Sequence, residues 1–163
     1  MPKFAGVDSL HRIGEWKDQF ERVRRWNERV QKTAPYCRER PFTTEQLDDV
    51  FAFFMNCYHL RDWLKNSKVI GQDKLDAFFA QNPEMQVCQD ICNGLKHYDL
   101  SRAKVDSEFF IGREFEYAAG LLNSPHGRVG LFVIAGRNQY DLYELAETCT
   151  RLWNDFLEKS GLV

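Results

Sequence analysis

The sequence has little net charge and no long apolar run. Its 22 Lys and Arg residues nearly balance 24 Asp and Glu residues, which leaves a formal net charge of −2. A nearly neutral protein has no overall field that would attract nucleic acid or an anionic membrane. The longest uncharged apolar run, Val50–Leu60, is much shorter than the roughly 20 residues of a membrane-spanning helix. We therefore expect a core helix there and no contact with a membrane.

Targeting and disulfide signals are also missing. No apolar stretch of a secretory signal peptide precedes residue 20, because the chain begins with mixed polar sequence. The number of cysteines is odd, and they lie in apolar stretches, which does not fit a disulfide framework. Buried, reduced thiols are typical of cytoplasmic proteins, so we expect a cytoplasmic protein. The five cysteines are Cys37, Cys57, Cys88, Cys92 and Cys149.

Familiar cofactor and metal motifs are absent as well. The chain has no glycine-rich phosphate loop, no Gly-x-Ser-x-Gly elbow and no dinucleotide fingerprint, so we expect no cofactor. Cys88 and Cys92 lie four residues apart, and Cys57 and His59 point to different sides of a helix. Neither pair has the spacing of a zinc site. We therefore interpret the cysteines as packing residues and expect no bound metal.

Aromatic side chains are abundant, with 13 Phe, 6 Tyr and 4 Trp residues. This much apolar surface excludes a mainly disordered chain. A chain of 163 residues is also long enough to bury a core without disulfides. No internal repeat or Ser/Gly linker divides the sequence. We expect one domain, residues 1–163, with aromatic layers in its core.

The spacing of apolar residues predicts five helices. Apolar residues recur about every 3.6 residues in the five segments, and the segment 44–66 is apolar around most of its circumference. A helix of that kind belongs in the centre of a bundle. Asp141 and Glu144 resemble a capping box at the start of the last helix. The predicted helices are 15–32, 44–66, 74–81, 84–98 and 141–159.

Between the fourth and fifth helices the pattern changes. Residues 108–117 and 128–135 are rich in β-branched and aromatic side chains that partly alternate, and the turn-forming segment 123–127 separates them. This predicts an antiparallel hairpin at about 108–135. The fold class is therefore mainly α: an up-and-down bundle of four to five helices with a β-hairpin inserted before the C-terminal helix.

A polar stripe of Asp90, Asn93 and His97 lies opposite the apolar face of the helix at 84–98. Exposed helix faces usually carry Lys and Glu, whereas Asp, Asn and His are poorer helix formers. The stripe is a solvated face, a structural hydrogen-bond network or a functional site, and the residues alone leave these alternatives open.

The helix at 44–66 carries a similar stripe of Asn56, His59 and Trp63, with Arg61 beside it. In a structural interpretation, Arg61 or His59 pairs with a carboxylate elsewhere in the bundle. In a functional one, this stripe faces the stripe at 84–98 and the two form a single polar cluster. An imidazole next to a carboxylate titrates near neutral pH and can act as an acid or a base.

The segment Asp90–His97 resembles the N-x-x-K-H end of the motif in HEPN-like helical domains, through Asn93, Lys96 and His97. The wider layout is similar too, with a long second helix, a helix that ends in Lys-His and a long closing helix. The resemblance spans roughly residues 15–100 and 140–160. It implies a helical domain that often dimerises, and active members are metal-independent ribonucleases. The implied catalytic residues here are His97, Asn93, Lys96 and Asp90.

The sequence departs from the family pattern where active members carry a catalytic arginine. The corresponding positions are Asp90, Ile91 and Cys92, so the guanidinium that would clamp a phosphate is missing. Together with a basic run in the first helix, Arg22–Trp26, the resemblance implies binding of RNA or a nucleotide with weak or absent ribonuclease activity. The alternative is a non-enzymatic module, with structural polar stripes, that binds a partner protein or a second copy of the chain. The expected ligand-binding residues are His59, Arg61, Asn56 and Trp63.

Overall fold

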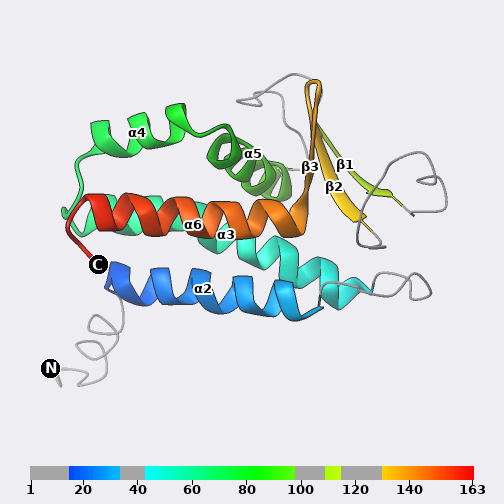
Figure 1. Ribbon diagram of the computed structural model, residues 1–163, viewed down its shortest axis with the longest axis horizontal. Helices are drawn as coiled ribbons and strands as arrows, with labels where there is room; N and C mark the ends of the chain where they lie inside the picture. The colour runs from blue at the N-terminus through cyan, green and yellow to red at the C-terminus, as the bar shows by residue number, and fades with distance from the viewer. Residues whose placement is uncertain (1–14, 34–42, 98–108, 115–129) are drawn as a thin grey trace, which may run out of the picture.

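The computed structural model describes residues 15–33, 43–97, 109–114 and 130–163. Within these segments it confirms the expected fold class, a mainly helical chain with an antiparallel hairpin before the C-terminal helix (Figure 1). Each described helix begins within two residues of its predicted start. The elements are α2 (Trp16–Thr33), α3 (Thr44–Asn66), α4 (Gln72–Gln81), α5 (Pro83–His97), β1 (Phe109–Glu114), β2 (Gly130–Ala135), β3 (Asn138–Asp141) and α6 (Leu142–Lys159).

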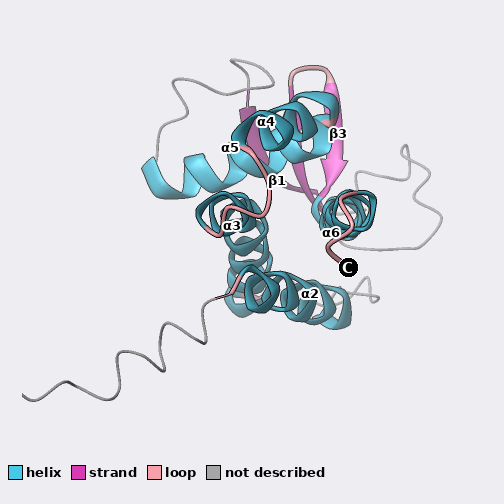
Figure 2. Ribbon diagram, turned by 90° about the vertical axis from the view of Figure 1, so that its left-hand side faces the viewer, coloured by secondary structure: helices cyan, strands magenta, loops and turns pink. Residues whose placement is uncertain are grey.

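Helix α3 occupies the centre of the bundle, as its apolar circumference predicts. It contacts the other four described helices, and Figure 2 shows it between α2 and α5. Its first turn is a capping box in which the Thr43 hydroxyl accepts from the Gln46 backbone N–H and the Gln46 side chain accepts from the Thr43 N–H. The Gln46 amide also donates to the Thr33 carbonyl at 2.7 Å. The start of α3 is therefore hydrogen-bonded to the end of α2. Within the described segments, no helix is both long and apolar enough to cross a membrane.

Aromatic rings fill the space between α3, α4 and α6. Trp153 is fully buried, and its ring centroid lies 4.8 Å from that of Phe78 and 5.9 Å from that of Phe79. Phe156 stacks on Phe78 at 4.3 Å. The indole Nε1–H of Trp153 donates to the Cys57 carbonyl at 3.1 Å, so its polar atom is satisfied in the core. The expected aromatic core is confirmed here.

A three-stranded antiparallel sheet with the order β1-β2-β3 packs against α6. The predicted hairpin strands pair from Phe109 opposite Ala135 to Glu114 opposite Gly130, and the predicted turn at 123–127 lies outside the described residues. Strand β3 is an addition, because the chain turns back at Gly136 and pairs again with β2. The φ of Gly136 is +62°, a left-handed conformation that favours glycine. The sequence analysis misses β3 since it is short and polar.

Helix α6 begins directly after β3. The Asp141 carboxylate accepts from the backbone N–H groups of Tyr143 at 2.8 Å and Glu144 at 3.0 Å, as the capping pattern predicts. From there α6 runs back along the bundle and contacts α2, α3 and α5 (Figure 1). This path brings the C-terminal helix next to the first described one.

Candidate functional site

The predicted stripe on α5 is not a simple solvated face. The Asp90 side chain is fully buried, and Asn93 is half-buried. The reason is that α5 packs against α3, α4 and α6, so much of its circumference is covered. Lys96 and His97 belong to the last turn of α5, but their side chains lie outside the described residues. Burial thus favours the structural interpretation for Asp90.

The residues of the α3 stripe contact different parts of the bundle. Asn56 faces α2, where its backbone and side-chain oxygens accept from the Gln19 amide at 3.0 and 3.2 Å. Its own side-chain amide donates to the Ala52 carbonyl at 2.8 Å. Trp63 is half-buried and packs against the hydrophobic core. Both side chains therefore take part in helix packing.

Arg61 forms the ion pair that the structural interpretation predicts. Its guanidinium donates to the Asp76 carboxylate on α4 and lies 5.7 Å from the centre of the Phe79 ring. The hydrogen bond from Arg61, helped by one from Gln72, lowers the pKa of the Asp76 carboxyl. This guanidinium is therefore occupied in joining α3 to α4.

His59 is the member of the α3 stripe that reaches α5. Its side chain is exposed, and Nε2 lies 4.0 Å from the Cys92 sulfur. One turn away, the Gln89 amide donates to the Tyr58 hydroxyl at 3.1 Å across the same helix pair. His59 thus reaches α5 at Cys92, which precedes Asn93, and the last turn of α5 with Lys96 and His97 follows.

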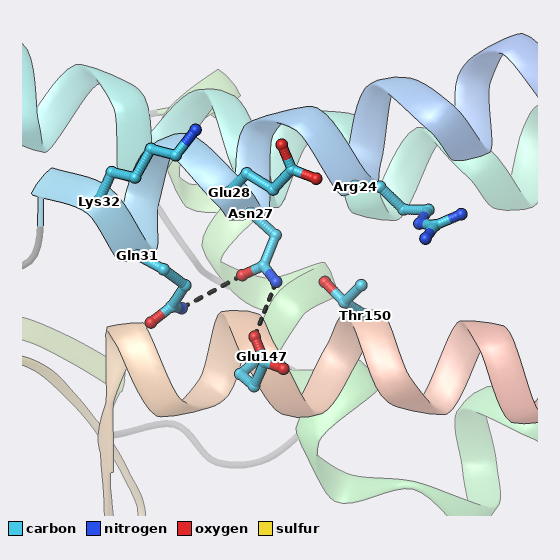
Figure 3. Close-up of a pocket in the computed structure, with 7 residues that line it drawn as sticks. All are labelled: Arg24, Asn27, Glu28, Gln31, Lys32, Glu147 and Thr150. Atoms are coloured by element: carbon cyan, nitrogen blue, oxygen red, sulfur yellow. Dashed lines mark hydrogen bonds between the residues drawn. The ribbon is translucent and has the colours of Figure 1, made fainter.

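A groove between α2 and α6 has a volume of about 570 Å³. Figure 3 shows Arg24 and Lys32 toward its two ends and two linked amides between them. A separation of eight residues along a helix corresponds to about 12 Å. The lining residues are Arg24, Asn27, Glu28, Gln31, Lys32, Glu147 and Thr150.

Hydrogen bonds across the groove position its amides. Asn27 Nδ2 donates to Glu147 Oε2 at 2.8 Å, and Gln31 Nε2 donates to Asn27 Oδ1 at 3.2 Å (Figure 3). The Gln31 amide also donates to the Tyr143 carbonyl at 2.9 Å. Asn27 and Gln31 are one turn apart on α2, so both amides face the same helix, α6. The sequence analysis gives these two residues no role, because polar residues on a charged helix look like an ordinary solvated face.

Helix α2 is strongly basic. Six Lys and Arg residues accompany three Asp and Glu residues in this helix. Arg29 pairs with Asp49 of α3 at 3.1 Å, and Arg24 pairs with Glu21 at 3.2 Å. Among the described residues neither Arg25 nor Lys32 forms an ion pair, and both are exposed. These two side chains can therefore offer cations to an anionic ligand.

Three buried cysteines are the described residues best placed to hold a metal ion. The sulfur atoms of Cys57 on α3, Cys88 on α5 and Cys149 on α6 all lie within 4.8 Å of one another. Burial raises the pKa values of the Cys88 and Cys149 thiols well above their usual range. The sequence analysis misses this cluster because metal-site spacing rules are local, whereas these residues come from three helices. Their common signal is their position on apolar helix faces.

The described structure therefore has an amide-lined groove with two cations and two carboxylates, and a buried thiol cluster, besides the partly dispersed residues of the predicted site. The groove has the charges and hydrogen-bonding groups of a binding surface. In comparisons with known proteins, no family model, no curated protein and no solved structure matches the chain.

Proposed function

We propose that the chain is a HEPN-like helical domain that binds RNA or a nucleotide and has weak or absent metal-independent ribonuclease activity. The observation that carries the binding role is the groove between α2 and α6, with cations toward its ends and amides between them. Its volume of about 570 Å³ lies in the usual range for small-molecule sites, about 300–1,000 Å³. The similar order of helices supports the relationship to HEPN-like domains.

The charge pattern of the groove suggests how a ligand would lie in it. Arg24 and Lys32 attract phosphate groups to the two ends. Glu28 and Glu147 would repel a phosphate from the middle and can accept hydrogen bonds from the amino groups of a base. RNA-binding proteins often read unpaired bases through such polar contacts. A base or ribose in the middle and phosphates at the ends is therefore the expected arrangement.

The positions of Asp90 and Arg61 support weak or absent cleavage. Asp90 is buried where the family pattern has an arginine, and Arg61 is engaged by Asp76. Neither residue supplies a free guanidinium to stabilise the charge that develops on a phosphate during cleavage. His97 remains the proposed catalytic histidine of any residual activity. The accessory polar residues proposed beside it are Asn93 and Lys96.

We also propose a cytoplasmic location, which the buried, reduced thiols of Cys57, Cys88 and Cys149 support. A homodimer is part of the same proposal, since HEPN-like domains often act as dimers. Light scattering coupled to size-exclusion chromatography measures the mass directly. A protein that remains monomeric at micromolar concentration would contradict the dimer.

Fluorescence anisotropy with a labelled single-stranded RNA tests the binding role. The double variant Arg24→Gln/Lys32→Gln should bind more weakly, and its salt slope (log K against log[salt]) should be shallower by about 1.4, at 0.7 per lost phosphate contact. The matched control Lys74→Gln/Lys159→Gln removes two exposed charges elsewhere and should bind like the wild type. An equal loss of RNA affinity in both double variants would contradict the proposal that the groove binds RNA. Absence of RNA and ATP binding at low salt would contradict the function and favour the protein-interaction alternative.

Cleavage is measured separately, with labelled RNA in the presence of a chelator. We expect slow cleavage or none, and any activity should disappear in His97→Ala but survive in the Lys74→Gln/Lys159→Gln control. Rapid turnover would contradict the assignment of weak activity. Activity that persists in His97→Ala would remove this histidine from the proposed site.

A further inference from the structure

We propose that Cys57, Cys88 and Cys149 form a buried binding site for a soft, trivalent, three-coordinate ion of the arsenic(III) class. The three sulfur atoms lie within 4.8 Å of one another and come from α3, α5 and α6. All three side chains have 0% exposure. This site is independent of the groove and of the proposed function.

The geometry requires only a small contraction around an ion. With ion–sulfur bonds of about 2.3 Å, three sulfur ligands of one ion lie about 4 Å apart or less. The upper limit of 4.8 Å between the present sulfur atoms leaves about an ångström of approach. Three thiols without a fourth partner suit an ion that prefers three ligands. Structural zinc, by comparison, is almost always four-coordinate.

The surroundings also hold the sulfur atoms in position. The Cys88 thiol donates to the Phe54 carbonyl at 3.7 Å, and the Cys149 thiol donates to the Glu84 carbonyl at 3.6 Å. The Trp153 indole donates to the Cys57 carbonyl at 3.1 Å. The cluster is therefore built into the contacts between three helices, and it is not a set of thiols on a mobile surface.

The charge of the surroundings favours a trivalent ion. A complex of three thiolates has a net charge of −2 with Cu(I), −1 with Zn(II) and zero with arsenic(III). Burying an uncompensated charge in an apolar core is costly. Burial raises the pKa of the Cys149 thiol, and the negative charge of the Glu84 carboxylate adds to this effect. Of these three complexes, the neutral one fits the core best.

The reaction with arsenite is balanced without a redox partner. Arsenous acid, As(OH)₃, is neutral at pH 7, so it can enter the apolar core uncharged when the helices part transiently. Three S–H bonds and three As–O bonds break, three As–S bonds form, and each hydroxyl leaves as water with the proton of one thiol. The oxidation state of arsenic does not change.

Native mass spectrometry of the full, reduced chain incubated with sodium arsenite tests the proposal. The expected product has gained one arsenic atom and lost three hydrogens, and X-ray absorption should show three sulfur neighbours and no oxygen. The ion should also raise the melting temperature, because the three thiols are held close together in the folded state. An unmodified mass, or an adduct that retains a hydroxyl, would overturn the proposal.

Single cysteine variants locate the site. Cys57→Ala, Cys88→Ala and Cys149→Ala should each lose the three-sulfur adduct, and circular dichroism identifies which of them are folded. The matched control is Cys92→Ala, because this buried cysteine is on α5 but outside the cluster, and it should bind arsenite like the wild type. If Cys92→Ala loses the three-sulfur adduct while the other variants retain it, the assignment of the site to Cys57, Cys88 and Cys149 is overturned. Binding of Cu(I) or Zn(II) without binding of arsenite would overturn the trivalent assignment. The wild-type X-ray absorption result stands even if no variant folds.

Discussion

Replacing Trp153 by alanine should be the most damaging single change in the bundle. This side chain is fully buried and has the largest volume among such residues. Its ring contacts Phe78 at 4.8 Å and both Phe79 and Phe156 at 5.9 Å between centroids. Removing it opens a cavity between α3, α4 and α6. Aromatic-to-alanine changes in protein cores cost about 3–5 kcal/mol of the free energy of unfolding.

The variant Trp153→Phe distinguishes the contribution of the aromatic ring from that of the indole N–H. It retains most of the aromatic packing but loses the Nε1–H that donates to the Cys57 carbonyl at 3.1 Å. A hydrogen bond of this kind contributes about 0.5–1.5 kcal/mol. Because the ring is also smaller, we expect the free energy of unfolding to fall by about 1–2.5 kcal/mol. The stability of Trp153→Phe should therefore lie between that of the wild type and that of Trp153→Ala.

Urea unfolding followed by circular dichroism measures both changes. The slope of the free energy against urea should stay constant, so that only the midpoint moves. For a chain of this size the alanine variant should lower the melting temperature by about 6–20 °C. Trp26→Ala is the control, because Trp26 is only partly buried against the core. A loss below about 1 kcal/mol for Trp153→Ala, or a loss no larger than that of Trp26→Ala, would refute the packing argument.

Three further changes test local features. Asp141→Ala removes the side chain that caps α6 and should cost about 1 kcal/mol in urea unfolding. Lys68→Gly should raise the melting temperature by a few degrees, because Lys68 has a φ of +58° just after α3 and glycine adopts this conformation without strain. Asp76→Asn should reduce stability at pH 7 but not at very low pH. The ion pair with Arg61 lowers the folded-state pKa of Asp76, so its contribution is present above the unfolded value of about 3.9 and is lost as the pH falls through the folded value.

Matched substitutions check these three expectations. Asp155→Ala changes an exposed carboxylate within α6 and should cost less than Asp141→Ala. Lys74→Gly puts glycine inside α4 and should destabilise the protein, unlike Lys68→Gly. Asp73→Asn is the control for Asp76, and a pH dependence equal to that of Asp76→Asn would contradict the ion-pair argument.

The positions of the helices could be predicted because their signals are local. The capping residues Thr43 and Asp141 and the apolar periodicity depend on neighbours within a few residues. The uniform apolar surface of α3 also predicts its central place. Strand β3 could not be predicted, because a segment of four mostly polar residues forms a strand only when β2 offers an edge.

The candidate sites were harder to predict, because a helical pattern shows the side on which a residue lies but not its neighbour. Asn56 and Arg61 are on one helix, yet they bind Gln19 of α2 and Asp76 of α4. The same limitation hides the cysteine cluster, whose members meet only after three helices pack. Predictions of function from stripes on single helices therefore need the packing of the whole bundle.

The position of α6 has a consequence for how the protein is made. This helix contacts α2, α3, α5, β2 and β3, yet the ribosome synthesises it after all of them. Roughly 60 residues separate the end of α5 from the end of α6, so at typical rates about 3–12 seconds of translation pass between them. During this time the nascent chain exposes the apolar surfaces that α6 will cover. We expect general chaperones to bind the growing chain at this stage and to release it once α6 has emerged.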